Sequence, residues 1–365
     1  MDFFHTAIHP SAIENVLAVL QSTMVSEGKK VKEFEDALSA TLGIEHPVAV
    51  NSGTSALHLA LVTAGIGPGD EVILPAQTFI ATGLTILMCG ARPVFGDIDY
   101  KTGNLDPASV RSKVTARTKA IMPVHWAGYP CDLDELHAIG SEHGLTIIED
   151  AAHALGAQYK GRSIGTISPF TIFSFQAIKH LTTGDGGAVA CRSQVDADHV
   201  QRLRWFGIDR VRDVPSILGE RVYDLSEVGY KYHMNDLAAA LGLGNLTDFL
   251  SRLARRRAIA GQYRSALGSV PGLRLLRSEA DRESADWLFT VLVERRMDFI
   301  KALQERAIPT SVVHLRIDRN AVFGGVHRDL KNQERFDNEQ ISIPLHSALS
   351  DEDVEQVIAA MREGW

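Results

Sequence analysis

Cysteine is scarce in this sequence, which contains Cys89, Cys131 and Cys191 among 365 residues. Their number is odd, their spacing is wide and no CxxC pair occurs, so the sequence predicts neither a disulfide framework nor a metal site. The chain also lacks an uninterrupted apolar run of about 18 residues, and its N-terminus lacks a basic segment followed by an apolar one. We therefore expect a protein of the reducing cytoplasm, with no secretory signal and no membrane span.

Basic charge is also in deficit, because 37 lysines and arginines face 45 aspartates and glutamates, giving a formal net charge of -8. Without a long basic stripe, nucleic acid is not expected as a partner. The sequence has no internal repeat and no low-complexity segment, which excludes a solenoid. Its length is typical of an enzyme with one large domain and a smaller one.

What the chain does have, up to about residue 190, is an alternation of short apolar runs with helix-like stretches. The runs that we predict as strands are residues 71–75, 92–95, 119–124, 145–149 and 171–175. This alternation predicts an α/β fold with a mainly parallel sheet that helices cover on both faces. In such sheets, ligands bind at the carboxyl ends of the strands.

Two further regions show helical periodicity. In residues 11–22 the apolar side chains share one face, which predicts an amphipathic helix lying on a larger body. They are Ile13, Val16, Leu17 and Leu20. Residues 235–266 predict a longer helical region that leads out of the large domain, and its arginines are interpreted as a solvated face in preference to a phosphate or nucleic-acid site. They are Arg252, Arg255, Arg256 and Arg257.

The stretch NSGTSALHLALVTAG, residues 51–65, places a turn of small residues directly before a helix. The first N–H groups of a helix lack partners within it, and here its positive dipole end lies beside the hydroxyls of Ser52, Thr54 and Ser55. This arrangement favours phosphate binding. Serine and threonine are also preferred as ordinary helix caps, so the stretch alone leaves that second interpretation open.

The stretch TIIEDAAHALGA, residues 146–157, is an apolar strand that ends in two acids. Asp150, at the carboxyl end, is well placed to hold a cation, and His153 is close enough in sequence to donate a hydrogen bond to the same ligand. The alternative is that Asp150 caps the following turn and that His153 is a core histidine.

The stretch TIFSFQAIKHLTTGDGGAVA, residues 171–190, carries Lys179 between a strand and a glycine-rich loop. A lysine near the edge of a buried sheet is costly unless it is paired, exposed or covalently used. A desolvated lysine amine is nucleophilic and forms a Schiff base with a carbonyl. Ser174, in the strand, offers a further hydroxyl. Considered alone, Lys179 is more simply interpreted as a surface lysine in a glycine loop.

Together the three stretches predict one ligand that carries a phosphate, a cationic ring nitrogen and an aldehyde. Pyridoxal 5′-phosphate (PLP) has all three groups, and its binding requires a Schiff-base lysine and an acid at the pyridinium nitrogen. The acid favours the protonated ring, which then acts as an electron sink. The sequence therefore predicts a PLP-dependent enzyme.

The same stretches, with GIGPGDEVILPAQTFIAT and GYKYHMNDLAAALGLGNL, occur in the order and spacing of the DegT/StrS family of sugar aminotransferases. The sequence resembles this family over nearly its whole length. The resemblance implies PLP-dependent transferase fold type I, as in the aspartate aminotransferase superfamily, with a seven-stranded, mostly parallel sheet flanked by helices. It also implies a large PLP-binding domain of residues 1–250, a small C-terminal α+β domain of residues 251–365, and a homodimer with shared active sites.

The resemblance further implies roles for individual residues. Lys179 would form the Schiff base and move a proton between the amino donor and the cofactor, Asp150 would pair with the ring nitrogen, and His153 would contact the ring hydroxyl. Phe79 would stack on the ring, with a plain core phenylalanine as the alternative. Gly53, Thr54 and Ser174 match phosphate contacts, Asn235 matches a phosphate contact reached from the neighbouring subunit, and Ser52 and Ser55 complete the cofactor-binding set.

Two positions depart from the family's common pattern. HWAG at residues 125–128 replaces HLYG, and His233 stands where an arginine is more common. We expect both to lie on the substrate side of the site. Lys179 is retained, whereas dehydratase relatives have a histidine in its place, although His180 is adjacent.

The resulting hypothesis is transfer of an amino group from an amino acid, L-glutamate in the first instance, to a nucleotide-linked keto-deoxysugar. Basic and hydrogen-bonding residues are available to bind the nucleotide diphosphate, although each alone is more simply interpreted as a surface residue. They are Arg204, Arg210, Lys231, His314 and Arg316. One alternative is an acceptor without a nucleotide, such as a keto-cyclitol or another ring ketone. Another is a regulatory or binding protein without catalysis, against which the intact Lys179 and Asp150 argue.

Overall fold

A seven-stranded sheet forms the centre of the computed structural model, which describes every residue of the chain except 210–215 and 221. Its strands, in spatial order, are β1 (Pro47–Val50), β9 (Gly187–Cys191), β8 (Phe170–Ser174), β5 (Thr146–Asp150), β4 (Thr118–Ile121), β2 (Glu71–Pro75) and β3 (Arg92–Gly96). Strand β9 runs antiparallel to both of its neighbours, and the other neighbouring pairs are parallel. The predicted α/β fold with a mostly parallel sheet is confirmed.

The five predicted strands correspond to β2, β3, β4, β5 and β8, and only their ends differ from the prediction. The sequence did not single out β1 and β9. Strand β9 reads GAVAC, and strand β1 is a run of four residues that contains a proline and an alanine. Small residues and short length weaken the strand signal, because the usual signal is a longer run of β-branched and aromatic side chains.

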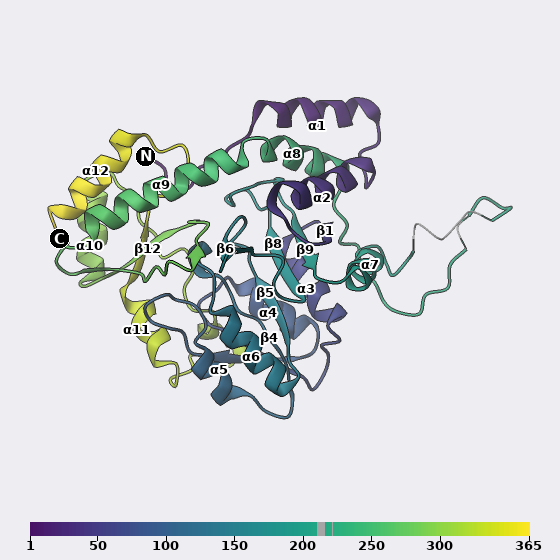
Figure 1. The fold of residues 1–365 in the computed structure, drawn as a ribbon, viewed down its shortest axis with the longest axis horizontal. Helices are drawn as coiled ribbons and strands as arrows, with labels where there is room; N and C mark the ends of the chain where they lie inside the picture. The colour runs from purple at the N-terminus through teal and green to yellow at the C-terminus, as the bar shows by residue number, and fades with distance from the viewer. Residues whose placement is uncertain (210–215, 221) are drawn as a thin grey trace.

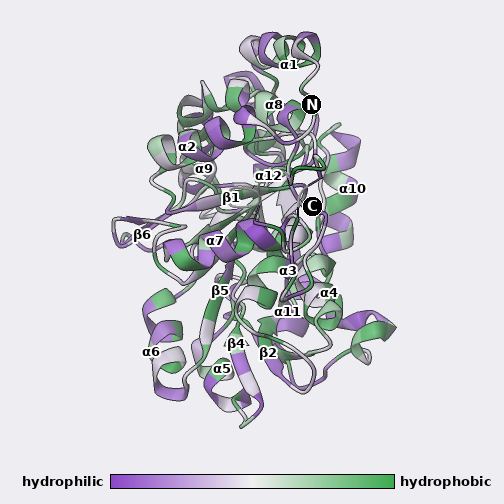
Figure 2. Ribbon diagram, turned by 90° about the vertical axis from the view of Figure 1, so that its right-hand side faces the viewer, coloured by the Kyte–Doolittle hydropathy of each residue, from purple (hydrophilic) through white to green (hydrophobic). Residues whose placement is uncertain are grey.

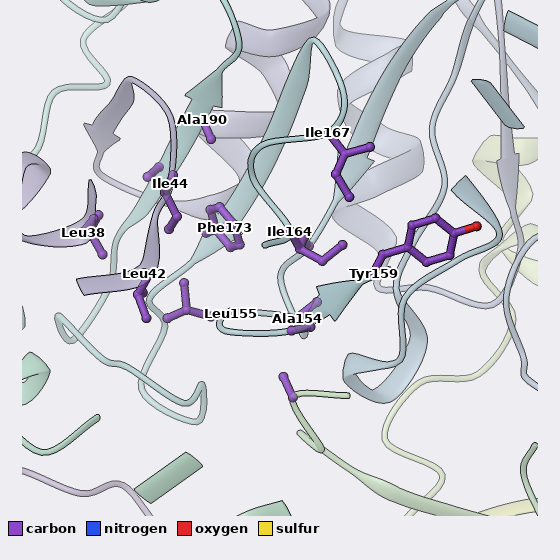
Figure 3. Packing of buried hydrophobic residues seen from close by; sticks show 14 of the residues in the cluster. Leu38, Leu42, Ile44, Ala154, Leu155, Tyr159, Ile164, Ile167, Phe173 and Ala190 are labelled. Carbon is purple, nitrogen blue, oxygen red and sulfur yellow. The ribbon is translucent and has the colours of Figure 1, made fainter. Parts of the chain in front are cut away.

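Helices cover both faces of this sheet (Figure 1). One apolar cluster joins the sheet to α2 (Lys29–Leu42), α5 (Pro107–Lys113), α6 (Leu133–His143) and α8 (Asp236–Leu246). Figure 3 shows Phe173 of β8 in this cluster, among Leu42, Leu155 and Ile164. A second cluster joins the other face to α3 (Gly53–Thr63), α4 (Ile80–Met88) and α7 (Gln194–Leu203). Hydrophilic residues lie on outer helices such as α7, as the purple in Figure 2 shows.

The C-terminal part of the chain has a sheet and an apolar cluster of its own. The sheet contains β10 (Leu273–Leu275), β12 (Phe289–Val293) and β13 (Gln340–Ile343). The helices that pack on it are α9 (Phe249–Leu267), α10 (Arg296–Glu305) and α12 (Asp351–Arg362). Helix α11 (Lys331–Glu339) follows two 3₁₀ turns, Ile317–Arg319 and Ala321–Phe323. Both turns contribute side chains to the apolar cluster between the central sheet and α3 and α4. A second three-stranded sheet contains β11 (Arg282–Glu283), β6 (Gln158–Tyr159) and β7 (Arg162–Ser163).

The helical region at residues 235–266 is divided into α8 and α9, and α9 runs from α8 towards α12 (Figure 1). Its arginines do not form a solvated face, so that interpretation was wrong. Arg256 is only 5% exposed and donates to the carbonyl of Leu345 at 2.8 Å. Other carbonyls accept from the rest of the cluster: Asn245 from Arg252, Leu349 from Arg255 and Gly156 from Arg257. The cluster therefore ties α9 to neighbouring segments.

Helix α1 (Pro10–Ser22) is present where the sequence predicted it, but it packs through a different face. Its buried residues are Ala12 and Val19, which lie against α8, where Gly244 leaves no room for a side chain because a Cβ there would be 2.2 Å from Ala12. The predicted packing face is exposed in this chain, with Ile13 at 65%, Leu17 at 52% and Leu20 at 53%. Among the described residues, no helix has both the length and the apolar character needed to cross a membrane.

Candidate active site

The three predicted stretches meet in one cavity at the carboxyl ends of the central strands. The space between its lining atoms, counted together with the open solvent at its mouth, is about 410 Å³. The residues singled out from the sequence that line it are Gly53, Thr54, Phe79, Asp150, His153 and Lys179. They come from the start of α3, the turn after β2, the end of β5 and the turn after β8, as the rule for parallel sheets predicts.

Lys179 is partly exposed as a residue, but its amine lies among protein atoms, with Nζ 3.7 Å from the centroid of the Trp287 ring. Burial lowers the pKa of Lys179 from 10.5 to about 7, and the nearby charge of Asp150 opposes this shift. Near neutral pH a substantial fraction of such an amine is unprotonated, and the unprotonated amine is the nucleophilic form. The interpretation of Lys179 as a surface lysine is therefore wrong.

Asp150 ends β5 and is only 4% exposed. Its Oδ2 accepts a hydrogen bond from the hydroxyl of Thr82 at 2.7 Å, and its Oδ1 accepts from the main-chain N–H of Ala152 at 3.1 Å. Burial raises the pKa of Asp150, while these two hydrogen bonds lower it. Asp150 thus caps the turn, as the alternative held, and also presents a carboxylate to the cavity, where a ligand cation would favour its charged form.

A buried pair of polar side chains, His125 and Glu149, lies next to Asp150 at the end of β5. His125 Nε2 is 2.7 Å from Glu149 Oε2, and both side chains are fully buried. The main-chain N–H of Cys131 donates to His125 Nδ1, which assigns the ring proton to Nε2 and makes it the donor to Glu149. Burial raises the pKa of Glu149, but the hydrogen bonds from His125 and Ser168, together with nearby positive charge, outweigh burial and the pKa is lowered. This pair anchors the end of β5, and the N–H of His125 donates to the carbonyl of Asp150.

His153 is buried between aromatic rings on the wall of the cavity. Its ring stacks on Trp287 at 3.8 Å between centroids and lies 5.7 Å from the ring of His314. Burial holds the pKa of His153 well below its usual range, so the ring is neutral. Its Nδ1 is buried and has no partner within the part of the chain that the structure describes. An unpaired ring nitrogen at this wall fits a ligand hydroxyl, so His153 is more than a satisfied core histidine.

The start of α3 combines a helix cap with an open cradle. Ser52 Oγ accepts from the N–H of Ser55 at 3.0 Å, and Ser55 Oγ donates to Asn51 Oδ1 at 2.6 Å, so these hydroxyls serve the cap. Gly53 and Thr54 instead line the cavity. A Cβ at Gly53 would lie 3.0 Å from Cβ of Ser174, so glycine is needed for this close approach. The cradle fits a phosphate, as the positive end of a helix favours.

Several residues named from the sequence lie elsewhere. Asn235 caps α8 and borders a different, open hollow, together with Asn51, Thr183 and Asp185. His233 packs against Trp205, 4.2 Å between ring centroids, away from the cavity. His180 is buried with Nε2 2.7 Å from the carbonyl of Ala285. The lysine at 179, and not its histidine neighbour, therefore faces the cavity.

The residues that the sequence offered for binding a nucleotide diphosphate lie in different environments. Arg204 is 2% exposed and pairs with Glu27 and Glu35, and Arg316 is 4% exposed and pairs with Asp318, so neither guanidinium is open to a ligand. Lys231 is exposed, and Arg210 lies outside the described residues. His314 lies beside two aromatic side chains of the site, with its ring 5.2 Å from that of Phe79 and 5.7 Å from that of His153.

Among the residues that sequence reasoning did not single out are Thr82, which lines the cavity and holds Asp150, and Trp287, which stacks on His153. Thr82 had a weak signal, because it follows Phe79 by three residues at the start of a helix, where side chains three apart share a face. Trp287 had none, since it lies more than a hundred residues after Lys179, just before β12. Trp126, which belongs to the HWAG stretch that departs from the family pattern, does border the site, because its ring lies 5.8 Å from that of His153.

Comparison with known proteins agrees with this architecture. The sequence profile of the DegT/DnrJ/EryC1/StrS aminotransferase family matches residues 6–362. The chain is 41% identical over 363 residues to the spore coat polysaccharide biosynthesis protein SpsC of Bacillus subtilis, covering 96% of this chain and 93% of that protein. It is 36% identical over 359 residues to GDP-perosamine synthase of Caulobacter vibrioides, covering 95% and 93%. The crystal structure of the sugar aminotransferase CalS13 from Micromonospora echinospora matches with a TM-score of 0.94 at 34% identity, covering 100% of both chains.

The sheet order and the cavity at its carboxyl edge define a PLP-dependent transferase of fold type I. Within that class, the chain belongs to the DegT/DnrJ/EryC1/StrS aminotransferase family. It is therefore a PLP-dependent sugar aminotransferase, which confirms the resemblance, the cofactor and the enzyme class. The alternative of a regulatory protein without catalysis is set aside.

Proposed function

We propose that the protein transfers the amino group of L-glutamate to the keto carbon of a nucleotide-linked deoxysugar. PLP supplies an aldehyde that takes up the amino group and a ring that accepts electrons. The observation that carries the amino-group transfer is the buried Lys179 amine, whose pKa of about 7 suits both attack on a carbonyl and proton transfer near neutral pH.

In this proposal, the other residues of the site hold and orient the cofactor. Asp150, fixed by Thr82, pairs with the ring nitrogen, and His153 offers its unpaired Nδ1 to the ring hydroxyl. The start of α3 and Ser174 hold the phosphate. Phe79 is 52% exposed at the rim, so it is not a core phenylalanine but is open to stack on the ring. With PLP bound, Lys179 Nζ would take the proton from the α-carbon of the donor and deliver it to the cofactor, and would carry out the reverse transfer, from the cofactor to the acceptor carbon that gains the nitrogen.

The nucleotide-linked acceptor is supported by a relative, since GDP-perosamine synthase carries a nucleotide in its name. A panel of keto sugars with and without a nucleotide tests this proposal, with amino-sugar formation measured by mass spectrometry. We expect a higher kcat/KM for the nucleotide-linked ketones. A preference for a keto-cyclitol or another nucleotide-free ketone would contradict it. Lys179→Ala is the control for the chemistry, and we expect it to abolish transfer.

We further propose that the protein acts as a homodimer with shared active sites. Asn235 is exposed and lies in a hollow apart from Lys179, which suits a residue that serves the partner's cofactor site. Beside it, α1 carries the exposed apolar face formed by Ile13, Leu17 and Leu20. An exposed apolar stripe of this kind marks a protein interface. Residues 1–250 then form the large cofactor-binding domain and 251–365 the small domain. The three free cysteines suit the cytoplasm.

A further inference from the structure

Trp287 touches three parts of the site at once, although no catalytic motif contains it. The side chain is fully buried, and its ring stacks on His153. The Nζ atom of Lys179 lies 3.7 Å from the ring centroid. Its indole Nε1 donates a hydrogen bond of 3.0 Å to the carbonyl of Ile178, the residue directly before Lys179. One side chain thus contacts both the amine of the lysine and the main chain that carries it.

Trp287 is itself held in place from two directions. Its main-chain N–H donates to the carbonyl of Ala127 at 2.8 Å, and a Cβ on the neighbouring Gly128 would lie 3.1 Å from that same nitrogen. The ring of Phe4, from the N-terminal arm, stacks on the indole at 5.6 Å with an interplanar angle of 25°. An indole fixed by its main chain, its N–H and a stacked ring has little freedom to move.

We propose that Trp287 is the positioning residue of Lys179: its ring walls off the amine from water and, through Ile178, it fixes where Nζ stands in the cavity. The inference rests on the proposed role of Lys179. A ring face this close to an ammonium also attracts it, but burial has the larger influence, because burial is the principal cause of the low basicity of the amine. Loss of the ring should therefore admit water and make Lys179 more basic.

Other charged and titratable groups lie around the amine and must stay unchanged in the test. They are His5, Asp150, His153, His180, His314, Arg252 and Arg256. None of these is replaced in the variants below. Trp287→Leu removes the aromatic wall and leaves a space beside a polar group, which water fills. Trp287→Phe keeps a ring and removes only the N–H donor and part of the ring's volume.

Trp365 provides a matched control at a distance. Its Nε1 also donates to a main-chain carbonyl, that of Glu294 at 2.7 Å, and its ring also packs on an aromatic ring, that of Phe299 at 4.9 Å. Trp365→Leu therefore removes the same kinds of contact without touching the cavity.

The test is the pH dependence of acetylation of Lys179 by acetic anhydride in the full-length, cofactor-free protein, read by mass spectrometry of the lysine peptide. In Trp287→Leu we expect the pKa of Lys179 to rise by about 1 to 2 units towards its ordinary value. In Trp287→Phe we expect a rise of less than about 0.5 unit, and in Trp365→Leu none. This readout does not depend on any acceptor, so it fails separately from the proposed function.

An unchanged or lowered pKa in Trp287→Leu would overturn the proposal and leave Trp287 as a packing residue. So would a rise in Trp287→Phe as large as in Trp287→Leu, because the ring would then not be the wall. If Trp287→Leu does not fold by circular dichroism, Phe4→Ala replaces it, since it removes only the outer ring of the stack. We expect a smaller rise in that variant, and no rise would count against the proposal.

Discussion

Lys179 and Asp150 line the same cavity. Burial lowers the pKa of Lys179 and raises the pKa of Asp150, so it favours the neutral form of both groups. A buried carboxylate is costly without a partner, and a cationic ring nitrogen supplies one. A buried amine is costly as an ammonium, and its unprotonated form is the one that attacks a carbonyl. The same burial that weakens both charged groups therefore prepares them for a ligand with an aldehyde and a basic ring nitrogen.

The hydroxyl of Thr82 tests the account of Asp150. Thr82→Val removes a hydrogen bond that lowers the pKa of Asp150, so that pKa rises further. A bond to a charged group contributes about 1.5–3 kcal/mol, so we expect PLP to bind at least about 10-fold more weakly and the acid limb of kcat/KM to move about one pH unit upward. Thr85→Val is the control, because within the described part of the chain that hydroxyl donates to the main-chain carbonyls of Ala81 and Thr82 and not to Asp150. Equal effects in both variants would refute the role of Thr82.

At the scale of secondary-structure elements, the sequence predicted five of the seven strands of the central sheet and the edge at which the site lies. Hydrophobic alternation is a local signal, and the rule for parallel sheets is a general one. The sequence did not predict which side chains reach that edge from elsewhere. Trp287 arrives from the segment before β12, and His314 from the segment before α11. Such contacts depend on how distant segments pack, which no local pattern encodes. The exposed face of α1 was mispredicted for the same reason.

Glu71, the first residue of β2, lies at the amino ends of the strands, opposite the site, and its substitution tests the stability of that region. Its carboxylate accepts hydrogen bonds from Arg92 on β3 and from Thr115 and Arg117 before β4. Burial raises its pKa, but these partners outweigh burial and lower the pKa of Glu71 from 4.5 to about 2. A carboxylate with a lowered pKa stabilises the fold above its unfolded pKa, and that contribution is lost as the pH falls through the folded value.

We therefore expect Glu71→Gln to lower the free energy of unfolding by about 1–3 kcal/mol at neutral pH. The difference from the parent protein should shrink between pH 4.5 and about 2. Urea unfolding at a series of pH values measures both. Glu142→Gln is the control, because its pair with Arg111 is exposed on both sides and should contribute little. A gap that stays constant as the pH is lowered would contradict this account of Glu71.

At the scale of the whole molecule, the single chain leaves an apolar face of α1 uncovered beside the hollow that contains Asn235. A chain that functioned alone would gain nothing from this exposure, since covering the face with polar side chains would improve solubility. In the homodimer that we propose, a second copy of the chain would bury the face, and Asn235 would reach the partner's cofactor site.

Leu17→Lys tests that assembly. A lysine in the middle of the exposed face should oppose burial of an apolar interface, so we expect the mass by light scattering to fall from dimer to monomer and PLP affinity to fall with it. Leu250→Lys is the control, because Leu250 on α9 is exposed to a similar degree, 55% against 52%. A variant that stays dimeric, or that becomes monomeric with unchanged cofactor affinity, would argue against a shared site at this face.

The visible absorbance spectrum of the purified protein with PLP, recorded before and after adding glutamate, tests the central claim most directly. Glutamine and aspartate are run in parallel, and Lys179→Ala is run as the matched variant. We predict a visible band that glutamate bleaches and that the variant lacks, which would establish Lys179, the cofactor and the donor together. A parent protein that stays colourless with PLP, or a Lys179→Ala variant with the same band and the same bleaching, would contradict the account.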